Sequence, residues 1–130
     1  MCRSFTCSFC GFCSVSIWER LPFNLSLKEY GISYKQVDLL KDGTFDYENI
    51  SKAINEKTRL VTIQRSKGYQ TRPSFGVKEI GELIAFVKNI KPDVICMVDN
   101  CYGEFVETIE PSDVGADMVV GSLIKNPGGG

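Results

Sequence analysis

One lysine near the end of this 130-residue chain stands in a segment that lets the backbone approach a ligand closely. Lys125 follows Gly121 and Ser122 and precedes three glycines at 128–130, and glycine has no side chain to hold a ligand away. The chain contains no histidine, which removes the commonest general base and a common metal ligand. Chemistry must come from Lys, Asp, Glu, Tyr, Ser or Cys side chains, and the amine of Lys125 is the first candidate.

Cysteine is the other reactive residue type, and it is concentrated at the start of the chain. Cys7, Cys10 and Cys13 form a C-x-x-C-x-x-C run, but a ferredoxin-type cluster needs a fourth cysteine followed by proline, and zinc needs a second ligand pair. We therefore expect no bound metal. Residues 1–26 are rich in Cys, Ser and Phe and show neither a strand nor a helix period, so we predict an atypical segment that is not part of the domain.

Length and composition favour one small domain with one core. The net charge is −1 and no stretch is a dense Lys/Arg run, so we expect no nucleic-acid partner. No window of about 18 apolar residues is present, so we expect no membrane partner. Residues 1–26 also lack the apolar stretch and cleavage site of a signal peptide, and we expect a cytoplasmic protein.

From residue 27 onward, short apolar runs alternate with helical periods. Strands are predicted at 33–40, 59–64, 94–99 and 118–122, longer helices at 46–57 and 74–91, and a short helix or turn at 110–117. Asp46 and Ser74 are the predicted helix caps, and in the second helix the apolar residues Val77, Ile80, Ile84 and Val87 recur at helical spacing. The run 94–99, apolar on both faces, is typical of a central parallel strand covered on both sides. The alternation predicts an α/β fold with a three-layer, mostly parallel sheet and flanking helices.

Two polar residues follow predicted strands at the carboxyl ends, where α/β sheets bind ligands. Asp99 ends one strand and Lys125 lies just beyond the last, so both are expected to face one crevice. Pyridoxal phosphate chemistry uses such a pair: an amine bonds to the aldehyde, and a carboxylate keeps the pyridine nitrogen protonated. Spacing alone leaves simpler interpretations open, namely an aspartate that caps a turn and a solvated lysine.

The residues between them resemble the lysine region of fold-type-I pyridoxal phosphate enzymes of cysteine and methionine metabolism. In that superfamily a V-D-N-x-aromatic segment precedes a proline, then G-A-D, two apolar residues and S-x-x-K with glycines behind. This order is matched by Val98, Asp99, Asn100, Tyr102, Pro111, Gly115, Ala116, Asp117, Ser122, Lys125, Gly128 and Gly129. The segments VDNCYGEFVE and GSLIKNPGGG are most similar to the methionine γ-lyase-like group of aluminium resistance proteins, and the resemblance covers residues 27–130.

The resemblance implies that Lys125 is the Schiff-base lysine and that Asp99 is the partner of the pyridine nitrogen. Asn100 and Ser122 would also bind the cofactor, Ser122 through its phosphate. Ile124 stands where the sulfur-amino-acid enzymes often carry a threonine, so one phosphate contact differs from their pattern.

Other residues at predicted strand ends are candidates for the pocket. Arg65, Tyr69 and Arg72 follow the strand at 59–64 and could meet a carboxylate or a phosphate. Tyr102 and Glu104 follow the next strand and could line the pocket. A solvated turn would explain Arg65 and Arg72 about as well as a ligand contact would. Packing would explain Tyr102 as well as a place in the pocket would.

The resemblance implies a pyridoxal-phosphate-dependent carbon–sulfur lyase that carries out a methionine γ-lyase-like elimination on an amino-acid substrate. Its full-length members are expected to be homo-oligomers with sites between subunits. Residues 27–130 would be part of the large cofactor-binding domain, and we expect this chain alone to be inactive.

Two alternatives remain open from the sequence. The chain could be a non-catalytic α/β fragment of such an enzyme. Ser122 and Lys125 also match the S-x-x-K motif of serine acyl-enzyme hydrolases. That chemistry needs a helix at the serine, which the preceding strand and the following Pro-Gly-Gly-Gly disfavour.

Overall fold

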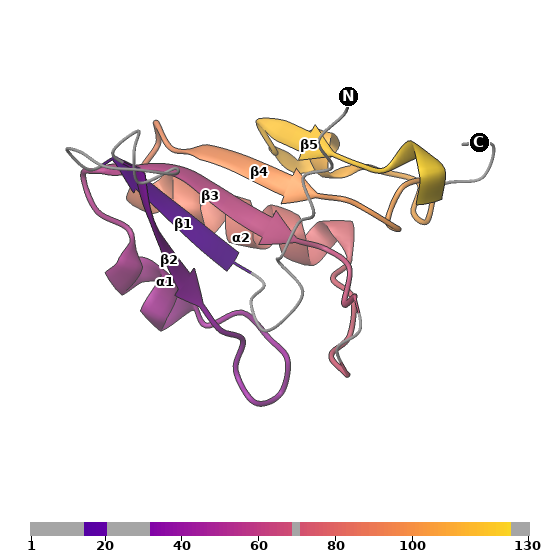
Figure 1. Ribbon diagram of the computed structural model, residues 1–130, viewed down its shortest axis with the longest axis horizontal. Coiled ribbons are helices and arrows are strands. Elements are labelled where there is room, and N and C mark those ends of the chain that lie inside the picture. The colour runs from indigo at the N-terminus through magenta and orange to yellow at the C-terminus, as the bar shows by residue number, and fades with distance from the viewer. Residues whose placement is uncertain (1–14, 21–31, 69–70, 126–130) are drawn as a thin grey trace, which may run out of the picture.

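The computed structural model describes residues 15–20, 32–68 and 71–125 (Figure 1). Within these ranges one sheet contains β1 (Val15–Arg20), β2 (Ile32–Val37), β3 (Thr58–Gln64), β4 (Ile95–Asp99) and β5 (Met118–Val120). The α-helices are α1 (Tyr47–Ala53) and α2 (Val77–Ile90), and the 3-10 turns are η2 (Pro111–Val114) and η3 (Leu123–Lys125). The predicted strands and helices after residue 27 are therefore present.

The sheet has the strand order β2-β1-β3-β4-β5. β3, β4 and β5 are parallel to one another, which confirms the α/β class and the parallel arrangement. β1 is antiparallel to both β2 and β3. The prediction that residues 1–26 are not part of the domain is therefore wrong for Val15–Arg20, which form the strand between β2 and β3. The sequence analysis missed this strand because β1 has no clean period of its own and the two strands that flank it determine its conformation.

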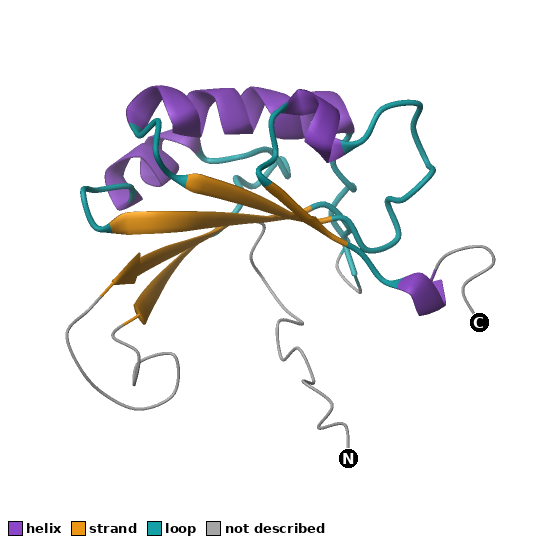
Figure 2. Cartoon of the chain, turned by 90° about the horizontal axis from the view of Figure 1, so that it is seen from above, coloured by secondary structure: helices purple, strands orange, loops and turns teal. Residues whose placement is uncertain are grey.

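The α-helices α1 and α2 lie on one face of the sheet (Figure 2). On β4, the side chains of Cys96 and Val98 are fully buried, whereas Ile95 on the other face is 43% exposed and Met97 is half-buried. Among the described residues, β4 is covered on the face of Cys96 and Val98 and not on the face of Ile95. The prediction that this strand is covered on both sides is therefore met for one face. The sheet and one helical layer account for two of the three predicted layers.

α2 provides most of the helical side of the core. The residues that it buries are Val77, Ile80, Leu83, Ile84 and Val87, which include every position that the helical spacing predicted. Burial of each such side chain stabilises the fold by about 1.5–3 kcal/mol. This packing fixes α2 across the parallel strands and thereby fixes the loops at their carboxyl ends.

The helix starts agree with the sequence prediction in one case and differ in the other. Asp46 caps α1 as predicted, and its Oδ1 accepts the Asn49 N–H at 2.9 Å. Ser74 does not cap α2, because the N-cap is Gly76. The Gly76 N–H donates to Oε2 of Glu79 at 2.8 Å, so a glutamate in the first turn satisfies a donor there.

Asp117, the last residue of the G-A-D segment, ties the start of β5 to its neighbours. Its Oδ2 accepts the Cys96 N–H at 2.7 Å and an N–H of the Lys88 ammonium at 2.6 Å. The hydrogen bond from Cys96, followed by the one from Lys88, lowers the pKa of Asp117 below its ordinary value of 3.8. Asp117 thus connects β4, α2 and β5 through one carboxylate.

We expect Asp117→Asn to lower the free energy of unfolding by about 1 kcal/mol or less near neutral pH, because the charged partner of Lys88 is lost while the side chain is partly exposed. The folded pKa is depressed, so this stabilisation is complete above 3.8 and is lost as the pH falls through the folded pKa. Urea unfolding at about pH 7 and about pH 3 measures the difference. The exposed Glu56→Gln is the control, and a wild-type–variant difference that does not shrink in acid would contradict this assignment.

Candidate functional site

The register of β4 and β5 puts Asp99 and the segment that carries Lys125 at one edge of the sheet. Asp99 is opposite Val120, and the Asn100 N–H extends the pairing by donating to the Val120 carbonyl at 2.8 Å. Ser122 and Lys125 follow directly after β5. Asp99 is half-buried, and its Oδ1 accepts the Cys101 N–H at 3.1 Å. The loop after β4 therefore starts beside the segment that carries the lysine.

The amine of Lys125 lies against that loop. Its Nζ is 4.6 Å from the centroid of the Tyr102 ring, which is within the range of a cation–π contact. Tyr102 has a left-handed backbone with φ of 67° and is 60% exposed. The backbone N–H of Lys125 donates to the backbone carbonyl of Ser122 at 3.1 Å. These contacts connect Lys125 with Tyr102 and Ser122, and the strand pairing puts Asp99 at the same edge of the sheet. A crevice shared by Asp99 and Lys125 stays a prediction.

Cys101 stands in the middle of this group, and its thiol is protonated at neutral pH. Burial, followed by a hydrogen bond with Asp99 and the charge of Asp99, raises the pKa of Cys101 to about 11; Lys125 opposes this shift and Glu104 adds to it. Thiolates rather than thiols are nucleophiles. The environment of Cys101 therefore does not favour a nucleophilic role.

Arg65 holds the loop after β4 from inside the fold, with a side chain that is only 4% exposed. Its Nη1 donates to Asn100 Oδ1 at 2.7 Å and to the Gly103 carbonyl at 2.9 Å. Nε donates to the Phe75 carbonyl at 3.2 Å, and Nη2 pairs with Glu107. Because a buried charge is costly unless it is paired and hydrogen-bonded, these contacts explain how the guanidinium is tolerated.

Asn100 belongs to the same internal network. It is 2% exposed, and its Nδ2 donates to Oε2 of Glu110 at 2.8 Å. The sequence predicted ligand contacts for Arg65 and Asn100, whereas the structure gives both of them partners within the protein. The sequence analysis did not identify Glu107 and Glu110 as partners of Arg65. The only signal was that both carboxylates lie in the loop after β4, the strand next to the one that Arg65 follows.

The remaining predicted residues are placed as follows. Arg72 donates from Nη2 to the Ser66 carbonyl at 2.5 Å, and its guanidinium lies 4.8 Å from the centroid of the Phe75 ring, so it braces the loop after β3. Tyr69 lies outside the described residues, as do Cys7, Cys10 and Cys13. Among the residues that are described, no group of three or more Cys, Asp and Glu side chains is arranged to hold a metal ion.

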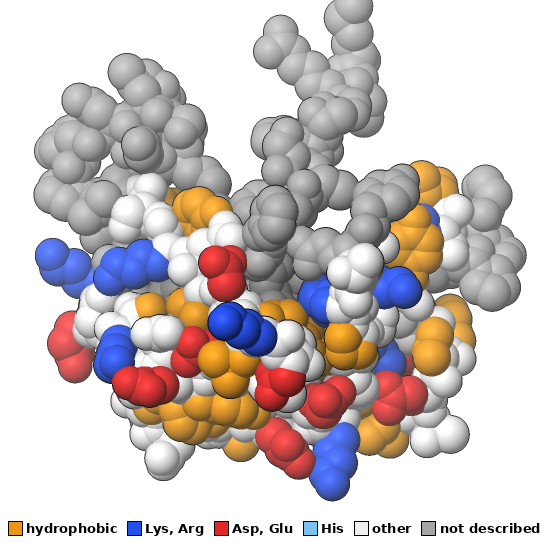
Figure 3. Space-filling model, turned by 90° about the horizontal axis from the view of Figure 1, so that it is seen from below, with side chains coloured by type: hydrophobic (Ala, Val, Ile, Leu, Met, Phe, Trp, Pro, Cys, Tyr) orange, Lys and Arg blue, Asp and Glu red, His pale blue; other side chains and the backbone are white. Residues whose placement is uncertain are grey.

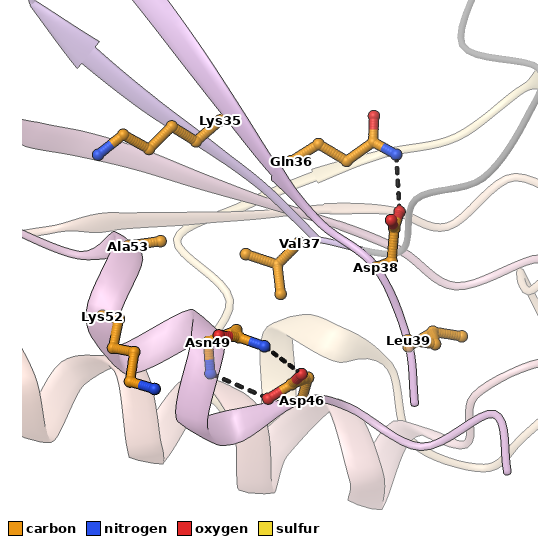
Figure 4. Close-up of a pocket in the computed structure, with 9 residues that line it drawn as sticks. All are labelled: Lys35, Gln36, Val37, Asp38, Leu39, Asp46, Asn49, Lys52 and Ala53. Atoms are coloured by element: carbon orange, nitrogen blue, oxygen red, sulfur yellow. Dashed lines mark hydrogen bonds between the residues drawn. The ribbon is translucent and has the colours of Figure 1, made fainter. Parts of the chain in front are cut away.

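Among the described residues, we consider a larger and a smaller hollow at different places on the fold. The larger, of about 620 Å³, lies between the end of β2 and α1 and is lined by polar residues such as Lys35, Asp38 and Asp46 (Figure 4). The smaller, of about 270 Å³, is lined by residues that include Arg65, Tyr102 and Glu107. Since Tyr102 also contacts Lys125 through its ring, the smaller of these two hollows adjoins the candidate site.

Surface charge and hydropathy add two observations. Acidic and basic side chains are interspersed on the face drawn in Figure 3. No helix within residues 15–20, 32–68 and 71–125 is long and apolar enough to cross a membrane.

We expect Arg65→Lys to destabilise the chain by about 3 kcal/mol, because one ammonium cannot reach the Asn100, Gly103, Phe75 and Glu107 acceptors together and leaves buried groups unpaired. Arg59→Lys is the matched control, since Arg59 is 59% exposed and pairs with Asp93 only at 3.6 Å. Urea unfolding of both variants measures the difference. Equal free energies of unfolding would show that the Arg65 network does not stabilise the loop.

Comparison with known proteins places the chain in a family. The methionine gamma-lyase family matches residues 19–130. An uncharacterized Bacillus subtilis protein, YnbB, is 61% identical over 105 residues, which are 81% of this chain and 25% of that protein. The structure of a carbon–sulfur lyase involved in aluminum resistance from Clostridium novyi matches with a TM-score of 0.71 and 52% identity, over 77% of this chain and 24% of that one.

A second solved structure agrees. A Listeria monocytogenes protein, described as a candidate cystathionine beta-lyase involved in aluminum resistance, matches with a TM-score of 0.77 and 56% identity, over 81% of this chain and 27% of that chain. The chain spans about a quarter of the length of these relatives. With its fold and most of its described length matched, the chain belongs to the methionine gamma-lyase family.

Proposed function

We propose that this chain carries the lysine-bearing part of a pyridoxal-phosphate-dependent carbon–sulfur lyase that catalyses an elimination on a sulfur amino acid. The observation that carries the proposal is the parallel pairing of β4 and β5, which puts Asp99 and the segment of Lys125 at one edge. Membership of the methionine gamma-lyase family supports it. The activity is proposed for the whole protein of the family, of which this chain covers about a quarter of the length.

The side chains at this edge fit pyridoxal phosphate in their chemistry, since an amine, a carboxylate and a hydroxyl are found together. When bound, this cofactor supplies an aldehyde that couples to amines and an electron-poor ring that stabilises negative charge on the substrate's α-carbon. Lys125 would hold the cofactor by its amine and move the proton at the substrate's α-carbon. Asp99 would keep a proton on the pyridine nitrogen, and the Ser122 hydroxyl would donate to the phosphate.

The alternative of a Ser-x-x-Lys hydrolase is less well supported by the geometry. In that chemistry the lysine amine takes the proton of the serine hydroxyl and must be hydrogen-bonded to it. Here Nζ of Lys125 lies over the Tyr102 ring, and among the described residues no hydrogen bond joins it to the Ser122 hydroxyl. Lys125 also lies on a 3-10 turn, η3, rather than on an α-helix.

We expect pyridoxal phosphate, followed by borohydride reduction, to leave a pyridoxyl group on Lys125. Reduction makes the linkage permanent, so even weak binding by this chain is recorded. Peptide mass mapping locates the adduct, and Lys125→Met, which keeps the length of the side chain without the amine, is the control. An adduct on Lys41 or Lys67 in place of Lys125 would exclude the proposed role.

We expect that loss of the Asp99 carboxylate lowers kcat strongly, whereas part of the bound cofactor is retained. Asp99→Ala, made at the aligned aspartate of a full-length relative, should reduce kcat by roughly 100-fold or more, because the proton on the pyridine nitrogen is no longer stabilised. Release of a 2-oxo acid from the substrate measures kcat, and absorption measures retained cofactor. An unchanged kcat would exclude Asp99 from this role.

A further inference from the structure

One carboxylate in the loop after β4 contacts the segment after β5. Oε1 of Glu104 accepts the Ser122 N–H at 2.9 Å, and both residues are half-buried. Ser122 in turn accepts the Lys125 N–H on its carbonyl at 3.1 Å. A short chain of hydrogen bonds therefore runs from Glu104 through Ser122 to the turn that carries Lys125.

Gly121 provides the space for this carboxylate. A Cβ atom built on Gly121 would overlap Oε1 of Glu104 and would stand 3.1 Å from its Cδ. The backbone of Gly121 is not in the left-handed region, so space rather than backbone angle explains why glycine is suited to this position. Glu104 and Gly121 thus form a matched contact between the two segments.

The loop that presents Glu104 is itself held in place from inside. Gly103 donates its N–H to the Asn100 carbonyl at 2.7 Å, and its own carbonyl accepts from Arg65 at 2.9 Å. A Cβ on Gly103 would lie 2.5 Å from Asn100 Oδ1 and 2.7 Å from Cδ of Arg65. Tyr102 and Glu104, which flank Gly103, are therefore held in place. Tyr102 contacts Lys125 and Glu104 contacts Ser122 from these positions.

We infer that Glu104 is a positioning residue that sets the place of Lys125 relative to Asp99. The inference rests on the proposed function, in which Lys125 is the reacting amine. Glu104 acts through the Ser122 N–H, and the Tyr102 ring acts directly on the amine. Without the carboxylate, the start of η3 loses the hydrogen bond that ties it to the loop after β4, and the amine is presented less often beside Asp99.

The test compares the rate at which pyridoxal phosphate and borohydride modify Lys125 in the wild-type chain and in three variants, with Lys67 of the same molecule as the internal reference. Glu104→Ala removes the acceptor, and Gly121→Ala pushes the carboxylate aside. We expect both to slow Lys125 modification by roughly three- to tenfold relative to Lys67, the effect of one hydrogen bond. Glu104→Gln keeps an Oε1 acceptor, so we expect it to retain a rate close to that of the wild type.

The outcomes separate the inference from a general effect on folding and from the proposed function. A fold defect would also affect Glu104→Gln and would appear in urea unfolding of the variants. If the wild type is modified at Lys125 and Glu104→Ala is modified equally fast or faster, the positioning role is wrong while the proposed function stands. If the wild type is not modified at Lys125, the proposed function fails and the inference fails with it.

Discussion

The parallel pairing of β4 with β5 is the constraint on which the candidate site depends. Parallel strands end at the same edge of a sheet, so the residues that follow them become neighbours regardless of their separation in the sequence. The pairing is supported at its start by the Asp117 carboxylate, which accepts the Cys96 N–H. It is extended past its end by the Asn100 N–H, which donates to Val120. Asp99 lies between these two attachments.

The loop after β4 depends on a buried charge rather than on its own conformational preferences. Tyr102 and Phe105 both have positive φ, at 67° and 62°, a region that is unfavourable for side chains of this size. Phe105 is also 82% exposed, so packing does not fix it. The interior contacts of Arg65 with Asn100, Gly103 and Glu107 fix the loop instead. Strain of this kind persists only when surrounding contacts determine the conformation, and it is often found near functional sites.

The sequence predicted the elements whose signals are local. The helical spacing of Val77, Ile80, Ile84 and Val87 identified the buried face of α2 correctly, and Asp46 was correctly predicted as a cap. The prediction of Asp99 and Lys125 at neighbouring strand ends also agrees with the structure, because the βα alternation determines where strand ends lie. Their roles toward a cofactor stay predictions.

The sequence could not predict features that depend on contacts between distant segments. Arg65 was predicted as a ligand residue, but its partners Asn100 and Glu107 are 35 and 42 positions away, and no pattern within the loop indicates them. Ser74 was predicted as a cap because serine is a good capping residue; the structure uses Gly76 with Glu79 instead. β1 was missed because two neighbouring strands, rather than a period of its own, determine it.

The most direct test of the account is a nuclear Overhauser measurement between the Tyr102 ring and the Lys125 side chain in the isotopically labelled chain. With Nζ 4.6 Å from the ring centroid, the account predicts cross-peaks from the ring protons to the terminal methylene protons of Lys125. It also predicts contacts between Val98 and Val119 across the paired strands. Strand contacts without any contact between Tyr102 and Lys125 would contradict the claim that the pairing of β4 and β5 brings the lysine to the loop that follows Asp99.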